Sequence, residues 1–220
     1  KDAINRADHI ICISEHTRKD LIELFDVDFD KTSVVHLAYD SSETIENKRS
    51  DDQRPFLLYV GWREWYKNFK PFLKCISRSK SIMNDFDIIA FGGGVFTLEE
   101  LKLMRKLGFR DGQVKQISGS DDLLAKYYSE ARAFVFPSLY EGFGLPPLEA
   151  MSYNCPVISS NASCMPEVIG NAAEYFDSNS LDEMLESVEK TVYSDSRTNE
   201  LVLSGKQQIK KYSWQKCTNE

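Results

Sequence analysis

The chain has 220 residues, 42% of them hydrophobic, and a formal net charge of −7. This length is enough for one large domain, or for one domain with part of a second. The acidic balance argues against general nucleic-acid binding, and the sequence has no run of about 18 apolar residues to cross a bilayer. The five cysteines are odd in number and widely spaced. They are therefore expected to be buried thiols rather than disulfides or metal ligands, which favours a reducing, cytoplasmic location.

The first 40 residues predict a strand, a helix and a second strand. Residues 7–14 are largely apolar and end in Ser14, a favourable helix N-cap, so a helix is expected over 15–25. A second strand is predicted over 32–37. Residues 41–54 are rich in Ser, Glu and Asp, which is typical of a linker. The three histidines precede this linker without metal-ligand spacing, and this predicts structural roles for them.

From Pro55 onward, short apolar strands alternate with helical segments. The expected strands are 56–60, 86–91, 113–118, 133–136, 156–159 and 173–176, and the expected helices are 68–82, 97–107, 121–130, 146–153, 165–169 and 180–192. This alternation predicts an α/β fold, a Rossmann-like parallel sheet with helices on both faces. Ligands of such folds bind beyond the carboxyl ends of the strands. Gly61, residues 92–94, Ser118 and Glu141 follow expected strands, so they are candidates for ligand contact.

Residues 140–151 combine two carboxylates with a flexible turn. They read Tyr-Glu-Gly-Phe-Gly-Leu-Pro-Pro-Leu-Glu-Ala-Met and run from an expected strand into a helix that starts with prolines. The glycines allow the backbone to approach a ligand closely, and the amides at the helix start suit phosphate oxygens. Glu141 and Glu149 are better suited to accept hydrogen bonds from hydroxyls. The stretch therefore predicts a ligand with both phosphates and hydroxyl-rich rings.

The same stretch resembles the E-x(7)-E signature of retaining glycosyltransferases of family four, which have the GT-B fold. Further segments resemble that family in the same order along the chain: Leu57-Leu58-Tyr59-Val60-Gly61 with Lys67-Asn68, Asp87-Ile88-Ile89-Ala90-Phe91 with the glycine turn, and residues 156–160 and 165–168. The resemblance implies that residues 55–220 are a nucleotide-sugar donor domain. Residues 1–40 would then be the C-terminal remnant of an acceptor-binding domain, joined to it by the linker 41–54.

The resemblance also implies roles for individual residues. Lys67 and Arg63 would neutralise the diphosphate, although Trp62 stands where many family members carry their arginine. Glu141 would orient the sugar hydroxyls, and Glu149 would hold the ribose. Glu141, Lys67 and Arg63 are thus the expected catalytic residues, with no metal ion. Further contacts to the donor are expected from Gly61, Gly92, Gly93, Gly94, Ser118, Gly142, Phe143, Gly144 and Leu145.

The function that the resemblance implies is a metal-independent, retaining hexosyltransferase of polysaccharide biosynthesis. Residues 140–151 and 167–173 look most like bacterial mannosyltransferases, which favours GDP-mannose as donor and a glycan or lipid-linked acceptor. No resident cofactor is expected. Acceptor binding and any peripheral attachment to the inner face of the cell membrane would belong to the missing part of the first domain. Two alternatives stay open: another enzyme on this scaffold, such as a sugar phosphorylase, and a non-catalytic module that binds a nucleotide sugar.

Overall fold

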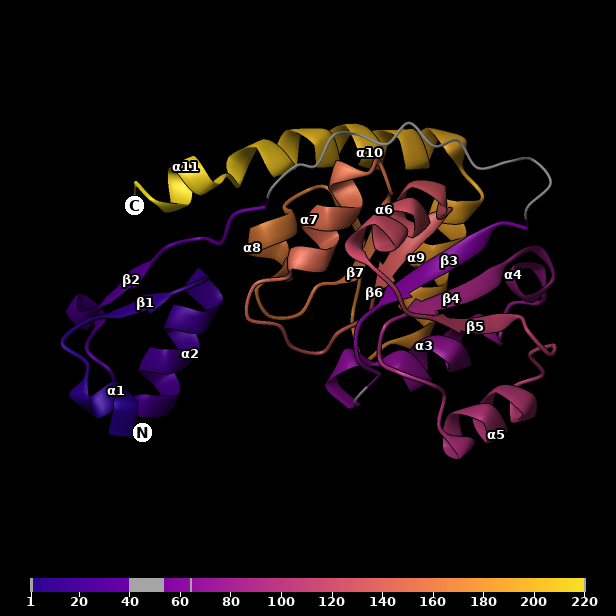
Figure 1. Cartoon of the computed structure of the whole chain (residues 1–220), viewed down its shortest axis with the longest axis horizontal. Helices are drawn as coiled ribbons and strands as arrows, with labels where there is room; N and C mark the ends of the chain where they lie inside the picture. Colours follow the sequence, from indigo (N-terminus) through magenta and orange to yellow (C-terminus); the bar gives the residue numbers. More distant parts are fainter. Residues whose placement is uncertain (1, 40–53, 64, 220) are drawn as a thin grey trace.

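The structure is a computed structural model that describes residues 2–39, 54–63 and 65–219. These residues form two units with separate sheets (Figure 1). In the N-terminal unit, the parallel strands β1 (Ile10–Cys12) and β2 (Thr32–Val34) pair, and three helical segments accompany them: α1 (Asp2–Arg6), α2 (Glu15–Phe25) and η1 (Phe29–Lys31). Except for Arg54, the predicted linker lies outside the described residues.

The larger unit is built on a six-stranded sheet with the order β5-β4-β3-β6-β7-β8. Its strands are β3 (Phe56–Val60), β4 (Asp87–Phe91), β5 (Val114–Ile117), β6 (Ala133–Phe136), β7 (Val157–Ser160) and β8 (Ala173–Phe176). All neighbouring strands run parallel, as the sequence predicted. The chain builds from β3 to one edge and then returns to start β6 on the other side of β3. The order therefore reverses between β3 and β6, where doubly wound sheets bind their ligands.

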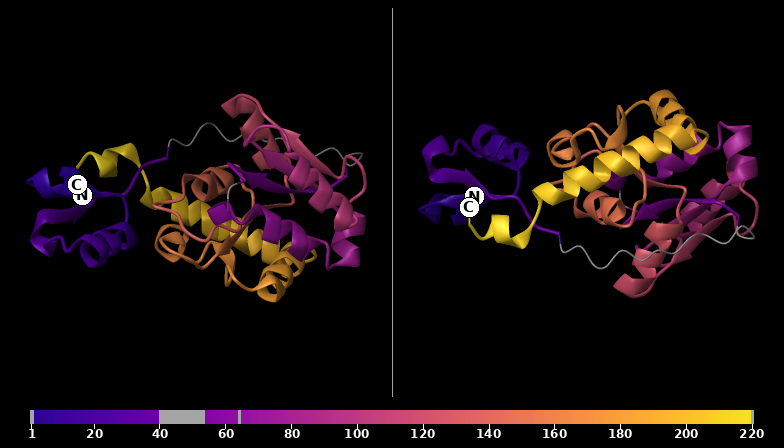
Figure 2. Two further views of the ribbon diagram at one scale, coloured as in Figure 1. Left: turned by 90° about the horizontal axis from the view of Figure 1, so that it is seen from below. Right: turned by 90° about the horizontal axis from the view of Figure 1, so that it is seen from above.

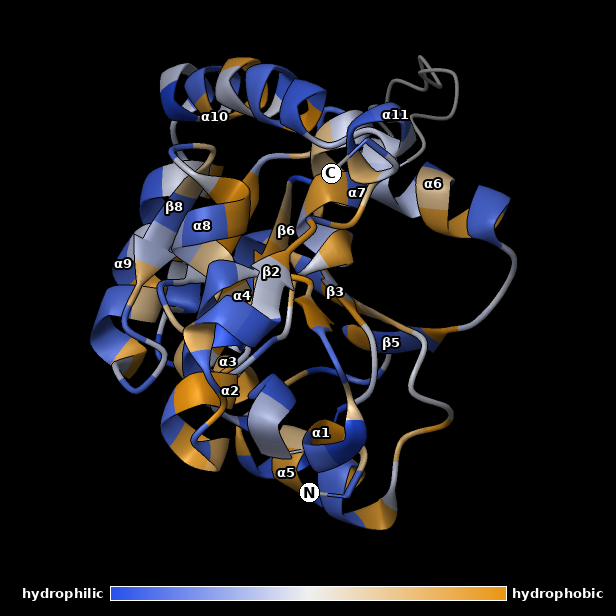
Figure 3. Ribbon diagram, turned by 90° about the vertical axis from the view of Figure 1, so that its left-hand side faces the viewer, coloured by the Kyte–Doolittle hydropathy of each residue, from blue (hydrophilic) through white to orange (hydrophobic). Residues whose placement is uncertain are grey.

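Helices cover both faces of this sheet because alternate strand residues are apolar on both sides. Leu57 and Tyr59 pack in one core with α3, α4 and α9, whereas Phe56 and Leu58 pack in a second core with α6, α7 and α8. Figure 3 shows β3 and β6 coloured hydrophobic between helices of mixed character. The helical segments are η2 (Trp65–Lys67), α3 (Phe69–Ile76), α4 (Lys80–Asp85), α5 (Leu98–Lys106), α6 (Asp121–Glu130), α7 (Leu145–Ser152), α8 (Met165–Ile169), α9 (Leu181–Val192), α10 (Asp195–Gln208), η3 (Ile209–Lys211) and α11 (Trp214–Cys217).

Two features differ from the sequence-based expectation. The helix expected over 68–82 is broken into α3 and α4, and the Ser79 side chain caps α4 by accepting a hydrogen bond from the amide of Ile82. The C-terminal helices α10 and α11 were not predicted. Helix α10 runs along the outside of the larger unit, and α11 extends beyond it towards the N-terminal unit (Figures 1 and 2). Within the described ranges, no helix has the length and apolar character needed to cross a membrane.

Candidate functional site

At the reversal point of the sheet, a lysine and a glutamate form an ion pair. Lys67 ends η2, the turn after β3, and Glu141 follows β6, so neighbouring strands bring both residues to the same edge. The Lys67 Nζ lies 2.6 Å from Glu141 Oε1, and each side chain is 15% exposed. The ring centroids of Tyr66 and Phe136 lie 5.4 and 5.5 Å from the ammonium group. The pair is thus largely withdrawn from water, where its charges act more strongly on a bound ligand.

The loop from β6 to α7 has its carbonyl groups engaged and several amides unpaired. The carbonyl oxygens of Glu141, Gly142 and Phe143 accept hydrogen bonds from side chains of other segments. Within the described part of the chain, the amides of Gly142, Phe143 and Gly144 have no acceptor. These amides lead into the N-terminus of α7, whose dipole also favours negative charge. The loop can therefore bind an anion such as a phosphate.

The glycines of this loop lie in close contact with other parts of the protein. Gly144 has φ = 100°, and a Cβ atom there would lie 2.7 Å from the Cε of Met165. A Cβ atom on Gly142 would lie 3.3 Å from the Cδ1 of Ile13, which belongs to the N-terminal unit. The side chain of Phe143 is buried between His36 and Tyr212, with ring-centroid distances of 5.9 and 5.6 Å. Any contact of Phe143 with a donor would therefore come from its backbone.

Arg63 has a structural environment that differs from the expected one. Its Nε donates to Glu100 Oε1 at 2.7 Å, and both side chains are only 5% exposed. Its terminal nitrogens donate to the carbonyl oxygens of residues 92, 94 and 95. Burial alone would raise the pKa of Glu100, but hydrogen bonds from Arg63 and from the amide of Thr97 outweigh burial and lower the pKa. Arg63 thus fixes the glycine turn, which argues against the catalytic role expected for it.

The remaining expected donor contacts follow strands at the same edge of the sheet. Gly61 and residues 92–94 all have positive φ, between 67° and 118°. At Gly93, a Cβ atom would lie 2.6 Å from Arg63 Nη1, so only glycine fits beside the arginine. Ser118 is exposed after β5, and its Oγ accepts a hydrogen bond from Gln116 Nε2 at 2.6 Å. Donor binding by these residues stays a prediction.

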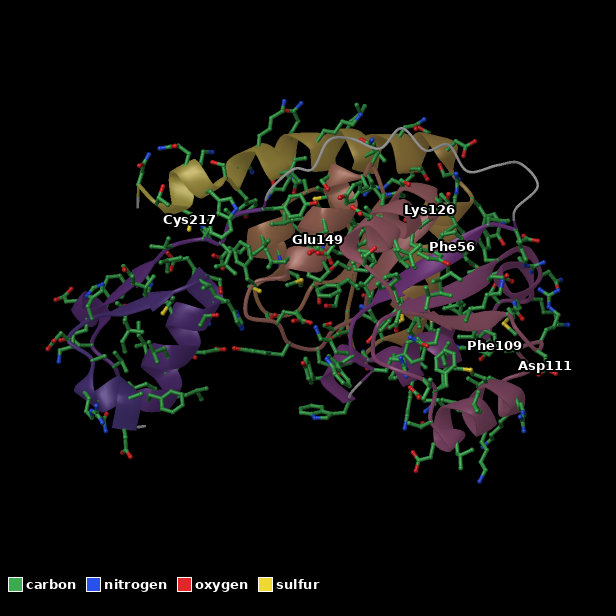
Figure 4. The ribbon with its side chains drawn as sticks, viewed as in Figure 1. Phe56, Phe109, Asp111, Lys126, Glu149 and Cys217 are labelled. Atoms are coloured by element: carbon green, nitrogen blue, oxygen red, sulfur yellow. The ribbon has the colours of Figure 1, made fainter. Side chains whose placement is uncertain are left out.

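Glu149 lies one turn into α7 (Figure 4) and lines a cavity of about 260 Å³. The other lining residues come mainly from α6 and from aromatic side chains: Tyr39, Asp121, Asp122, Leu124, Ala125, Tyr128 and Tyr153. The Tyr128 hydroxyl donates to Glu149 Oε2 at 3.0 Å. Burial raises the pKa of Glu149, the Tyr128 hydrogen bond acts in the opposite direction, and the nearby Asp121 adds to the rise. The acidic lining suits hydroxyl groups rather than phosphate.

Several residues around the site were missed in the sequence analysis. Ser163 and Cys164 donate to the carbonyl of Glu141 at 3.1 Å each, and Cys164 also lies 3.2 Å from the carbonyl of Phe143. Glu167 contacts the start of α2 from α8. No local pattern marks these residues, because their partners lie more than 20 positions away in the sequence.

The cysteines are thiols, and four of the five are buried, as expected. No group of three or more His, Cys, Asp or Glu side chains among the described residues has the arrangement to hold a metal ion.

Comparison with known proteins identifies the family. Residues 40–208 match the family described as "Glycosyl transferases group 1". The chain belongs to this family. O-antigen chain mannosyltransferase B from Escherichia coli is 29% identical over 231 residues, which cover 100% of this chain and 60% of that protein. O-antigen chain mannosyltransferase RfbU from Salmonella typhimurium is 30% identical over 207 residues, which cover 92% of this chain and 57% of that protein. The chain therefore spans less than two thirds of either relative.

Solved structures of other glycosyltransferases share the fold. TarM from S. aureus superposes with a TM-score of 0.84 at 17% identity, covering 98% of this chain and 43% of TarM. WaaG, named as a glycosyltransferase of lipopolysaccharide biosynthesis, superposes with a TM-score of 0.80 at 15% identity, covering 95% of this chain and 60% of WaaG. The six-stranded parallel sheet with its helices thus matches the C-terminal domain of GT-B glycosyltransferases, as predicted.

Proposed function

We propose that this chain is the donor-binding part of a retaining hexosyltransferase that moves mannose from GDP-mannose to a glycan or lipid-linked acceptor. The observation that carries this proposal is the Lys67–Glu141 pair at the sheet's reversal point. Glu141 directly precedes residues 142–144, whose amides have no acceptor among the residues that the structure describes. The names of the two sequence relatives support mannose and polysaccharide assembly. The TarM structure is named as a complex with UDP and alpha-GlcNAc-glycerol, which supports a nucleotide sugar and a sugar acceptor.

The chemistry follows from where charge develops. Cleavage of the bond between the sugar and the diphosphate leaves negative charge on the phosphate and positive charge at the anomeric carbon. In this proposal, Lys67 and the amides of Phe143 and Gly144 stabilise the leaving phosphate without a metal ion. One preorganised donor of this kind contributes about 3 kcal/mol of transition-state stabilisation. Glu141 holds Lys67 in place and accepts hydrogen bonds from the sugar hydroxyls.

The cavity beside Glu149 is proposed to receive the ribose. Its carboxylate and the neighbouring Asp121 and Asp122 supply acceptors for hydroxyl groups, and Tyr128 fixes the orientation of the Glu149 carboxylate. The volume of about 260 Å³ is close to the lower end of ligand pockets, which suits one ring rather than the whole donor. The sugar and phosphates would then extend towards Lys67.

We propose that the acceptor binds mainly to an acceptor-binding domain whose last part is the N-terminal unit. A lipid-linked acceptor would bring the intact protein to the inner face of the cell membrane as a peripheral, cytoplasmic enzyme. Transfer to an acceptor also separates this proposal from the alternative of a non-catalytic binding module. Intact protein that binds GDP-mannose but never releases GDP in the presence of membrane extracts containing lipid-linked glycans would favour the module.

A thermal-shift experiment on the chain tests donor binding directly. GDP-mannose, GDP and UDP-glucose are compared at equal concentration. A ligand present at 100 times its dissociation constant stabilises a protein by about 2.7 kcal/mol. We expect GDP and GDP-mannose to raise the unfolding temperature and UDP-glucose to leave it unchanged. A rise with UDP-glucose alone would replace GDP-mannose by a uridine nucleotide sugar, and no rise with any ligand would contradict donor binding.

A further inference from the structure

The loop from β6 to α7 is held in place by residues of the N-terminal unit. The hydroxyls of Ser14 and Thr17, at the start of α2, lie 2.8 and 3.1 Å from the carbonyl oxygen of Gly142 and donate to it. Ser14 is fully buried, and its Oγ also accepts the amide of Thr17 at 3.0 Å. A carbonyl oxygen has two lone pairs, so it can accept from both hydroxyls. The Ser14 hydroxyl, which has one proton, also lies 2.9 Å from Thr17 Oγ1, so the two side chains and the carbonyl form one hydrogen-bonded group.

Glu167 anchors the helix that carries these hydroxyls. Its two carboxylate oxygens accept the amides of Glu15 and His16 at 2.7 and 3.1 Å. The amides in the first turn of a helix have no partner within the helix, and a carboxylate there also complements the helix dipole. The Nε2 of His36 lies 2.7 Å from the same carboxylate. The N-terminal unit is therefore docked on α8 at a defined position next to the loop.

Holding a carbonyl also fixes the direction of an amide. In a trans peptide, the C=O of one residue and the N–H of the next point in opposite directions. No described peptide bond is cis. The hydrogen bonds from Ser14 and Thr17 to the carbonyl of Gly142 thus point the amide of Phe143 away from α2. The neighbouring carbonyls of Glu141 and Phe143 are held by Ser163 and Cys164 instead, so the Phe143 amide alone depends on the N-terminal unit.

We propose that Ser14 and Thr17 are positioning residues that aim the amide of Phe143 at the leaving phosphate. This inference rests on the proposed function, because it assigns that phosphate to the loop. The N-terminal unit then contributes to donor binding without touching the donor. Because Glu167 docks α2 beside the loop, it also determines whether the loop can bind the phosphate. The position of the acceptor-binding domain and the affinity for the donor are therefore coupled.

The test uses variants of the protein and GDP as the probe, in calorimetric titrations. Losing the hydroxyls in a Ser14→Ala, Thr17→Val double variant should weaken GDP binding by about 2- to 12-fold, the factor for one hydrogen bond of 0.5–1.5 kcal/mol. Guanosine, which has no phosphate, should bind as it does to the wild type. Thr17→Val alone should show a smaller loss, and Thr17→Ser, which keeps the hydroxyl, should bind GDP normally. Lys19→Gln is the control on α2, since this side chain is 67% exposed.

The outcomes separate this inference from the proposed function. Thermal melts first check that each variant folds, because Ser14 also caps α2. If the double variant does not fold, the GDP affinities of Thr17→Val and Thr17→Ser decide whether the inference holds. Equal GDP affinity of folded variants and wild type would overturn the inference, as would equal losses for Thr17→Ser and Thr17→Val. If the wild type itself does not bind GDP, the proposed function fails. A crystal structure of the double variant then still tests the positioning, because an unchanged peptide between Gly142 and Phe143 would overturn it.

Discussion

The two partly buried cations of the site, Arg63 and Lys67, differ in how many of their N–H donors the protein uses. Arg63 donates to Glu100 and to three backbone carbonyls, so the described residues engage its Nε and both of its terminal nitrogens. Lys67 has three N–H donors, and among the described residues its hydrogen-bond partner is Glu141. Two donors of Lys67 are therefore available to a ligand. We therefore expect Arg63 to contribute mainly to stability and Lys67 mainly to ligand binding.

Replacement of Arg63 should therefore act on folding. Arg63→Met leaves the Glu100 carboxylate buried without its partner, and breaking such a pair costs about 3–5 kcal/mol. Urea unfolding should show this loss in the free energy of unfolding. Arg78→Met is the matched control, because Arg78 pairs with Asp182 at a site where the side chains are 46% and 81% exposed, and its loss should stay below about 1 kcal/mol. Normal stability with lost GDP affinity would instead make Arg63 a phosphate ligand.

Glu149 should lower stability at neutral pH while it supports binding. Its pKa is raised in the folded state, so the folded protein holds more protons than the unfolded chain between the two pKa values. The stability of the wild type therefore falls as pH rises through that window. Glu149→Gln removes this loss, so it should be more stable than the wild type at pH 7.5, with a smaller difference at pH 4.5, and should bind GDP more weakly. A variant less stable at both pH values would show that the carboxylate stabilises the fold.

At the scale of secondary structure, β3, β4 and β6 could be predicted because they are short, mainly apolar runs, and the more polar β5, β7 and β8 because they continue the alternation of strands with helices. The break between α3 and α4 was missed because residues 77–79 contain neither glycine nor proline, although the polar run at 77–81 interrupts the apolar period and Ser79 is a favourable N-cap. Helix α10 is largely polar and contains Gly205, which is unfavourable inside a helix. A Cβ atom there would lie 2.9 Å from the Cγ of Met151, so this glycine allows α10 to approach α7. The formation of α10 therefore depends on its tertiary contact with α7, which the local sequence pattern does not indicate.

The turn into α7 gives a prediction at the same scale. Gly144→Ala places a side chain at φ = 100°, which costs roughly 1–2 kcal/mol in the free energy of unfolding. Gly108→Ala is the matched control, because Gly108 has φ = 83° and no atom within 4 Å of its ideal Cβ position. Chemical denaturation should show a loss for both variants, and the loss should be larger for Gly144→Ala because its Cβ also meets the side chain of Met165. Of the two variants, only Gly144→Ala should weaken GDP binding. If Gly144→Ala and Gly108→Ala bind GDP with equal affinity, the loop does not contact the phosphate.

For the whole molecule, the sequence predicted which residues meet at the reversal point but not what holds them. Lys67 and Glu141 could be placed because each follows a strand, and parallel strands end at one edge. Ser14 and Glu167 could not be placed, since Ser14 acts 128 positions away on Gly142, and Glu167 acts 152 positions away on Glu15. The bond of Arg63 to Glu100 could not be predicted either, since Glu100 lies 37 positions away on α5; the role of Arg63 at the phosphate stays a prediction.

The measurement that tests the central claim most directly is a calorimetric titration of the wild type and Lys67→Met with GDP and with guanosine. If Lys67 meets the diphosphate, its loss should weaken GDP binding by about 1.5–3 kcal/mol, roughly 10- to 150-fold, and leave guanosine binding unchanged. Lys70→Met, which removes a half-exposed lysine paired with Glu99, should bind GDP like the wild type. Equal GDP affinity of the wild type and Lys67→Met would contradict the account.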